Sequence, residues 1–153
     1  AKVVLVTGGG RGIGAATAKL AAKRGYDVAI SYQANDAAAA SVVEAVEAEG
    51  RRGFAFKGDV AREADILAMF AAVEKSLGPL WGLVNNAGIT GRIGRVEDVT
   101  AATVQAVIDV NLTGCFFGLR AAAEVMVAQG RGGRIINMAS QAAKSGFPHA
   151  QAY

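Results

Sequence analysis

Short apolar runs recur along the chain, without the polar alternation that marks a strand with one face in water. Runs of this kind are typical of strands buried on both faces of a sheet. They predict five strands, at residues 2–7, 27–32, 53–57, 80–85 and 134–139. Both faces of the predicted sheet must therefore be covered by other elements.

Longer segments with a helical repeat of apolar residues separate these runs. They predict helices at residues 13–24, 36–49, 62–76 and 101–128. Gly25 and Gly50 stand where a glycine commonly ends a helix, and Asn35 or Asp36 is suited to cap the second helix. Alternating strands and helices indicate right-handed crossovers, and hence an α/β fold with a doubly wound, Rossmann-like parallel sheet.

The organisation along the chain is simple. No repeat, low-complexity tract or proline- and glycine-rich linker divides it, so we expect residues 1–153 to form a single domain. No helix is predicted to cover the last strand, which would leave an apolar strand poorly covered on one face. We therefore expect this domain to be incomplete at its C-terminal end.

A glycine-rich turn follows the first predicted strand and leads directly into the first helix. It comprises Thr7, Gly8, Gly9, Gly10, Arg11, Gly12, Ile13 and Gly14. A strand, a tight glycine turn and a helix N-terminus together bind the pyrophosphate of a dinucleotide, because unpaired N–H groups and the helix dipole favour an anion there. We therefore expect the single domain of residues 1–153 to be a dinucleotide-binding domain; a tight turn without a ligand is the alternative.

The end of the second strand bears on the choice of cofactor. Dinucleotide folds that bind NAD usually carry an acid there, about 20 residues after the turn, whereas this chain has Tyr32 followed by Gln33. Arg11 in the glycine turn is placed to meet a 2′-phosphate. The pattern favours NADP, with NAD as the alternative, and a solvated Arg11 without a ligand is also compatible with it.

Polar residues follow the third and fourth strands, at the sheet edge where ligands of open α/β folds collect. Asp59, before Val60, is placed either to accept a hydrogen bond from an adenine amino group or to cap the next helix. The fourth strand runs into Asn85, Asn86, Ala87 and Gly88. Asparagine tolerates turns and bonds backbone groups, so these residues suit a cofactor site or a purely structural turn.

Three further polar residues are candidates for chemistry. Asn111 falls on one stripe of the long helix with Val104, Ile108 and Cys115, which predicts a buried amide that serves as a structural bridge or as part of a site. Ser140 follows the fifth strand and Tyr153 comes thirteen residues later. A phenol acts as an acid or base near neutral pH only if a nearby cation lowers its pKa.

Composition narrows the function classes. The net charge is +3 and the basic residues are scattered, so we expect no nucleic-acid partner. Cys115 is the single cysteine; we expect a buried, unreactive thiol and a reducing, cytoplasmic location. One His and one Cys make a zinc site improbable. Apolar runs are short and no signal-like segment opens the chain, so we expect no membrane span and no secretion.

Taken together, these residues resemble the short-chain dehydrogenase/reductase family. The glycine turn, Asp59 with Val60, and the segment Asn85–Gly88 look like its cofactor motifs, and Asn111, Ser140 and Tyr153 match three members of its catalytic tetrad in order and spacing. The resemblance covers the whole chain. It implies a sheet of order 3-2-1-4-5 with later strands missing, and a metal-free oxidoreductase similar to 3-oxoacyl reductases and bacterial sugar or polyol dehydrogenases.

The same resemblance implies roles for these residues. Tyr153 would donate or accept the proton, Ser140 would orient the oxygen of an alcohol or ketone substrate, and Asn111 would hold a water in a proton relay. The lysine of the tetrad would follow Tyr153 by four residues, beyond the end of this sequence, so a non-catalytic dinucleotide-binding fragment is the alternative. Homo-oligomers, tetramers or dimers, are the implied assembly of the whole protein.

Overall fold

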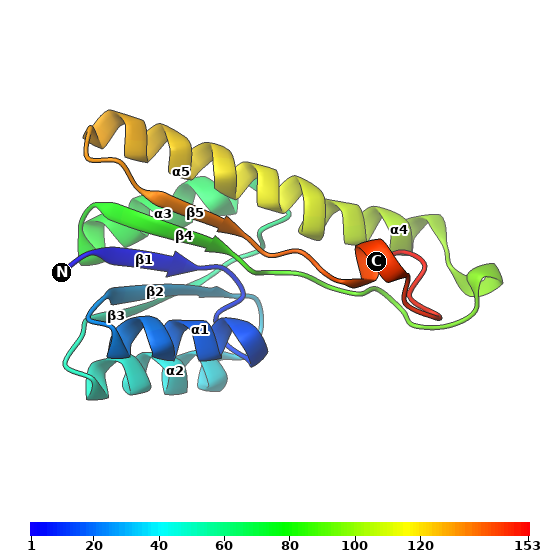
Figure 1. The fold of residues 1–153 in the computed structure, drawn as a ribbon, viewed down its shortest axis with the longest axis horizontal. Helices are drawn as coiled ribbons and strands as arrows, with labels where there is room; N and C mark the ends of the chain where they lie inside the picture. The colour runs from blue at the N-terminus through cyan, green and yellow to red at the C-terminus, as the bar shows by residue number, and fades with distance from the viewer.

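Five parallel strands form the centre of the molecule (Figure 1), and the computed structural model describes residues 1–153. The strands are β1 (Val3–Val6), β2 (Asp27–Tyr32), β3 (Gly53–Lys57), β4 (Leu80–Asn85) and β5 (Arg134–Asn137). All neighbouring pairs are parallel and the order is β3-β2-β1-β4-β5. The predicted fold class and strand order are thereby confirmed.

Helices cover both faces of this sheet. Helices α1 (Gly12–Lys23) and α2 (Asp36–Ala48) lie on one face, and α3 (Glu63–Leu77) and α5 (Cys115–Gln129) lie on the other (Figure 1). Successive residues of β1 point to opposite faces, so Val4 packs in the core under α1 and α2 while Leu5 packs in the core under α3 and α5. Burial on both faces explains why the strands lack polar alternation.

The ends of these helices follow local sequence signals. Gly25 and Gly50 adopt φ angles of +89° and +69° just after α1 and α2, a conformation that glycine takes without steric cost. The side chain of Asn35 caps α2 by accepting a hydrogen bond from the N–H of Ala38 at 2.9 Å. Strands β1–β4 and helices α1–α3 agree with their predicted bounds to within one residue at each end.

The helix predicted at 101–128 is interrupted. It consists of α4 (Ala101–Ile108), a π-helical segment (Asp109–Gly114) and α5. The predicted buried stripe is wrong, because Val104 and Ile108 are 37% and 40% exposed. Glycines instead form the close contact: a Cβ on Gly114 would lie 2.8 Å from the carbonyl oxygen of Val60. The extra residue in the π turn changes which side chains face the sheet.

Length and composition alone make the helix from Ala101 to Gln129 long and apolar enough to cross a membrane, although we expected no such segment. A helix that covers a sheet can meet the same criterion. The α5 part behaves in that way, because Ala121, Ala122 and Met126 are buried in the core with residues of β4.

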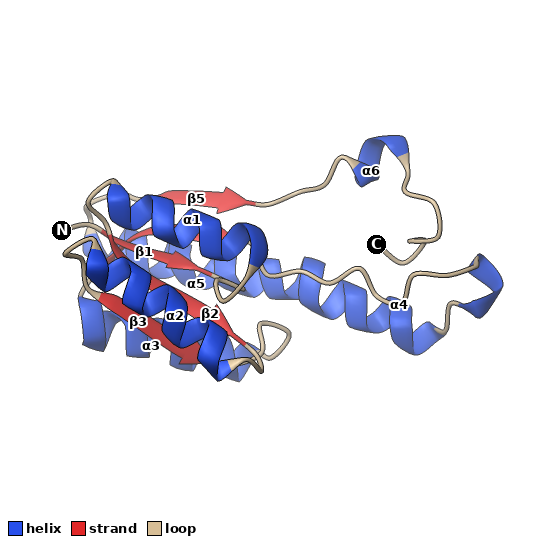
Figure 2. Ribbon diagram, turned by 90° about the horizontal axis from the view of Figure 1, so that it is seen from below, coloured by secondary structure: helices blue, strands red, loops and turns tan.

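The chain beyond β5 leaves the sheet. Strand β5 ends at Asn137, two residues before the predicted end, and three of its four residues are exposed. The following segment contains the short helix α6 (Ala142–Ser145) and extends past the strand ends (Figure 2). It returns beside the loop after β4, where the N–H of Gly94 donates to the carbonyl oxygen of His149 at 2.8 Å. A 3-10 turn (Val96–Asp98) precedes α4.

Candidate functional site

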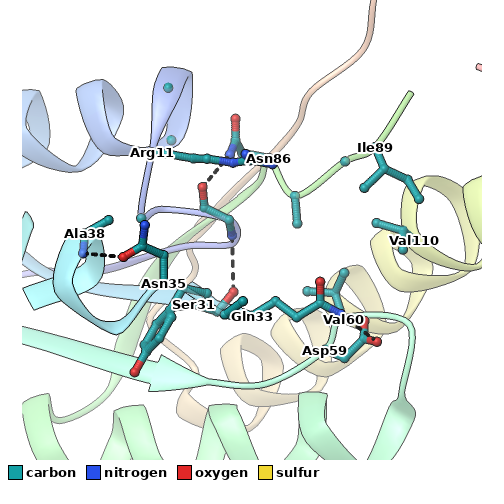
Figure 3. Close-up of a pocket in the computed structure, with 18 of the residues that line it drawn as sticks. Arg11, Ser31, Gln33, Asn35, Ala38, Asp59, Val60, Asn86, Ile89 and Val110 are labelled. Atoms are coloured by element: carbon teal, nitrogen blue, oxygen red, sulfur yellow. Dashed lines mark hydrogen bonds between the residues drawn. The ribbon is translucent and has the colours of Figure 1, made fainter. Parts of the chain in front are cut away.

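A pocket of about 540 Å³ lies at the carboxyl ends of β1, β2, β3 and β4 (Figure 3). This volume is in the range of small-molecule and cofactor sites. Twelve of the thirteen residues predicted to bind a cofactor line it: Gly8, Gly10, Arg11, Gly12, Ile13, Gly14, Tyr32, Asp59, Val60, Asn86, Ala87 and Gly88. Segments far apart in the sequence therefore meet around one cavity.

The glycine turn brings backbone close to backbone on one side of the pocket. Gly8 and Gly12 have φ angles of +64° and +53°, where glycine is favoured. A Cβ on Gly14 would lie 2.5 Å from Nδ2 of Asn86 and closer still to the carbonyl oxygen of Gly8. Only glycine at position 14 allows the first turn of α1 to pack this closely on the end of β1.

The N-terminus of α1 opens onto the pocket. Its N-cap residue is Arg11, whose side chain makes no capping hydrogen bond, and its first turn contains no acid. Gly12, Ile13 and Gly14 all line the cavity. The first N–H groups of a helix lack intrahelical partners and carry the positive end of the dipole. This end of α1 is therefore built to receive an anion.

Thr7 lies beneath the pocket, where it is 2% exposed. Its hydroxyl oxygen accepts hydrogen bonds from the backbone N–H groups of Asn86 and Ala87, at 3.0 and 3.1 Å. The Asn86 side chain returns two bonds, to the carbonyl oxygens of Thr7 and Gly8, at 2.9 and 3.3 Å. These bonds tie the glycine turn to the end of β4 and set the width of the pocket.

Asp36, the first acid after β2 in the sequence, is held by hydrogen bonds outside the pocket. Asp36 does not line the pocket; it accepts a hydrogen bond from the Tyr32 hydroxyl at 2.9 Å and two from Lys57 at 3.0 and 3.1 Å. The Lys57 and Tyr32 bonds hold the pKa of Asp36 below its ordinary value, and the same carboxylate raises the pKa of Tyr32. Arg11, by contrast, is exposed and pairs with no acid of the chain.

Asp59 reaches the pocket from the end of β3. One carboxylate oxygen accepts from the N–H of Ala61 at 2.9 Å, and the other accepts from the Gln33 amide at 3.1 Å. The N-cap of α3 is Arg62, so the prediction that Asp59 caps the next helix is wrong. The carboxylate instead braces its own turn, because it bonds a backbone group two residues on.

No cofactor role was predicted from the sequence for eight residues that line the pocket: Ser31, Gln33, Ala34, Asn35, Ala38, Gly58, Ile89 and Val110. Five of them, Gln33, Ala34, Asn35, Gly58 and Ile89, lie within four residues after the end of β2, β3 or β4, which is the signal that would have found them. Ser31 is buried at the end of β2, and its hydroxyl oxygen accepts from the N–H of Gly8 at 3.2 Å.

Asn111 is a structural bridge. Its side chain accepts from the N–H of Ile89 and donates to the carbonyl oxygen of Ile89, both at 2.8 Å. Because Ile89 lines the pocket, the π-helical segment holds the loop after β4 in place through this one side chain. Of the two alternatives drawn from the sequence, the bridge is observed, and it lies directly beside the candidate site.

Ser140 and Tyr153 do not line the pocket. The Ser140 hydroxyl oxygen accepts from the N–H of Ala142 at 3.1 Å, and Tyr153 is 48% exposed at the end of the chain. No hydrogen bond joins either residue to the other or to Asn111. The structure therefore does not assemble these three residues into one cluster, and their catalytic roles stay predictions.

Cys115 is partly exposed rather than buried. Desolvation nevertheless raises the pKa of its thiol, which agrees with an unreactive cysteine. Its carbonyl oxygen accepts from the Asn85 amide at 3.2 Å, and the same amide donates to Asn137 at 2.9 Å. Asn85 thus joins β4 to both β5 and α5 below the pocket.

Comparison with known proteins agrees with this geometry. The sequence model of the family described as short chain dehydrogenase matches residues 2–153. An uncharacterized oxidoreductase, YgfF, of Escherichia coli (strain K12) is 42% identical over 148 residues, which are 95% of this chain and 60% of that protein. A 3beta-hydroxysteroid dehydrogenase of Mediterraneibacter gnavus is 42% identical over 152 residues, 99% of this chain and 54% of that protein.

Among solved structures, an NAD+-bound xylitol dehydrogenase is similar, with a TM-score of 0.92 and 34% sequence identity. The match covers 99% of this chain and 58% of that one. The chain therefore spans less than two thirds of the length of these relatives.

Proposed function

The chain belongs to the short-chain dehydrogenase family, and on that premise we propose that it forms the dinucleotide-binding domain of an NADP-dependent oxidoreductase. The protein transfers a hydride between the nicotinamide and the carbon of a secondary alcohol or ketone of 3-oxoacyl, sugar or polyol type. One observation carries the proposal: the uncapped N-terminus of α1 and the unpaired Arg11 open onto a single pocket at the strand ends.

The residues present fit a dinucleotide. The N–H groups at the start of α1 would hold the pyrophosphate, as in other glycine-rich turns that precede a helix. Asp59, on the opposite wall, would accept from the adenine amino group, and Asn86 with Gly88 would border the path toward the nicotinamide. The cofactor supplies or accepts the hydride when it is bound.

The preference for NADP rests on two side chains. Arg11 lines the pocket and pairs with no acid, and Asp36, the first acid after β2 in the sequence, is already held by Tyr32 and Lys57. A ribose 2′-hydroxyl would thus find the Asp36 carboxylate already engaged, whereas a 2′-phosphate would meet the guanidinium of Arg11. The xylitol dehydrogenase of the same fold is NAD+-bound, so side chains rather than the fold must decide this preference.

In the catalytic step, Tyr153 gives a proton to the substrate oxygen or takes one from it, and Ser140 orients that oxygen. Asn111 contributes mainly through position, because its amide fixes Ile89 on the pocket wall. One lone pair of its side-chain oxygen remains for a relay water, since a carbonyl oxygen can accept two bonds. The relatives are longer than this chain, and we propose that Ser140 and Tyr153 close onto the pocket in the whole protein.

The cofactor preference is tested by replacing Arg11 in the intact protein. Arg11→Ala should weaken NADPH binding about tenfold to a hundredfold through loss of a charge-assisted contact, and should leave NADH binding nearly unchanged. Arg95→Ala is the matched control, because this exposed arginine pairs with Glu97 and does not line the pocket. Fluorescence titration with both cofactors measures the dissociation constants. Equal affinities for NADPH and NADH in the unaltered protein would refute the preference.

The separation of Ser140 and Tyr153 from the pocket favours one other function, a dinucleotide-binding module without turnover. Such a protein would bind NADPH but oxidise or reduce none of the secondary alcohols and ketones offered to it. Turnover that is abolished by Tyr153→Phe, with cofactor binding retained, would exclude this alternative. For the whole protein we propose a cytoplasmic homo-oligomer, a tetramer or dimer.

A further inference from the structure

Gln33 reaches across one end of the pocket. It is the first residue after β2, and its amide nitrogen donates to Asp59 at 3.1 Å, beyond the end of β3 (Figure 3). This is the only hydrogen bond between the side chains of two residues that line the pocket. The carboxyl ends of β2 and β3 are thereby joined by a bond that faces the cavity and not the core.

The Asp59 turn is held from three directions. The Asp59 N–H donates to the Asp65 carboxylate at 2.9 Å, one Asp59 oxygen accepts from Ala61, and the other accepts from Gln33. Of these three bonds, only the one from Gln33 brings a second pocket-lining residue to Asp59, since neither Ala61 nor Asp65 lines the pocket. A carboxylate has about four lone-pair positions. Each Asp59 oxygen therefore keeps the capacity to accept one more bond.

The unused lone pairs of the Asp59 carboxylate favour a ligand that offers a hydrogen-bond donor at this place. An exocyclic amino group on a purine can donate to Asp59, whereas a carbonyl oxygen at the same place would set lone pairs against a carboxylate. The bond from Gln33 fixes which way the carboxylate turns. Once a base covers this exposed pair and removes water from it, the orientation matters more, because hydrogen bonds strengthen in a drier environment.

We infer that Gln33 is a positioning residue for recognition of the base: it aligns Asp59 so that the pocket accepts a 6-aminopurine and disfavours a 6-oxopurine. This inference rests on the proposed dinucleotide function. It goes beyond that function because it assigns the choice of base to a residue that contacts Asp59 and not to the carboxylate alone.

The test compares two cofactors in the intact protein: NADPH and its hypoxanthine analogue, in which an oxygen replaces the 6-amino group. The unaltered protein should bind NADPH at least about tenfold more tightly than the analogue, the effect of one hydrogen bond to a charged group. Gln33→Met keeps an unbranched stem but has no amide, and should reduce this ratio to about threefold or less. Gln33→Ala should reduce it to the same extent.

The matched control is Gln105→Met on α4. It removes another hydrogen bond between a glutamine and an aspartate, from Gln105 to Asp109 at 2.7 Å, and neither residue lines the pocket. Its base preference should equal that of the unaltered protein. Gln33→Met with full discrimination would overturn the inference, and so would a loss confined to Gln33→Ala, which would assign the effect to the stem. An unaltered protein that binds neither cofactor would instead overturn the proposed function.

Discussion

Replacing Gly14 by alanine tests the close packing that shapes the pocket. The added Cβ would lie 2.5 Å from Nδ2 of Asn86 and 3.0 Å from the carbonyl carbon of Gly8, with the carbonyl oxygen nearer still. Backbone atoms of Gly8 cannot swing aside as a flexible side chain would. Helix α1 must therefore move outward by roughly 1 Å to restore an ordinary van der Waals separation.

This outward movement of α1 lowers the free energy of unfolding. Overpacking of this kind costs about 1–3 kcal/mol. It also stretches the two bonds from the Asn86 amide to the carbonyl oxygens of Thr7 and Gly8, each worth about 1 kcal/mol. Gly14→Ala should thus lower the free energy of unfolding by about 2–4 kcal/mol. It should also weaken NADPH binding at least about tenfold, because the first turn of α1 leaves its place on the pocket wall.

Gly94→Ala is the matched control, because no atom lies within 4 Å of its added Cβ and its φ angle is not positive. This change should leave stability the same or raise it slightly, by restricting the unfolded chain. Urea unfolding gives the free energies, and fluorescence titration gives the dissociation constants. If Gly14→Ala matched Gly94→Ala in both measurements, the close approach would have no structural role.

Two further outcomes are expected. Burial would raise the pKa of Asp27, but the hydrogen bonds and charge of Arg52 outweigh it and hold this pKa below 3.8. The ion pair between Asp27 and Arg52 therefore stabilises the fold fully above that pH, and less as the pH falls through the folded-state pKa. Asp27→Asn should flatten that part of the acid-unfolding curve, and an unchanged curve would contradict the assignment. Asn111→Ala removes both hydrogen bonds to Ile89, so hydrogen exchange at the Ile89 N–H should accelerate at least about tenfold while the sheet amides stay protected. Equal protection of the Ile89 N–H in the variant and the unaltered protein would show that the bridge is dispensable.

The fold was predictable because its signals are local or nearly so. Strand β2 and helix α2 could be placed from an apolar run, a capping asparagine at position 35 and a glycine at position 50. The later part of the chain was less predictable. Strand β5 ends at Asn137 and not at Ala139, and α6 was not foreseen, because the segment after β5 is fixed by long-range contacts such as that between Gly94 and His149.

The candidate site was likewise predictable only in part. The glycine turn carries its own motif, so its place on the pocket wall follows from a short stretch of sequence. The π turn at Asp109–Gly114 has no such motif, since it depends on how Gly114 meets Val60 and how Asn111 meets Ile89. The role of Gln33 was missed for a related reason, because it arises from a partner 26 residues away, just beyond the end of the neighbouring strand β3.

The central position of β1 has a consequence for the order in which this protein is made. Its pairing with β2 closes over a short stretch of chain, whereas its other edge waits for β4, with Val6 aligned to Val84. Closing so long a loop has an entropic cost that precedes any reward from the contacts. During synthesis, the Thr7 hydroxyl has none of its hydrogen-bond partners until Val84, Asn86 and Ala87 leave the ribosome, since these bonds span 77, 79 and 80 residues. The pocket is therefore among the last features of the first four strands to be completed, although six of its 20 lining residues lie between Gly8 and Gly14, at the very start of the chain.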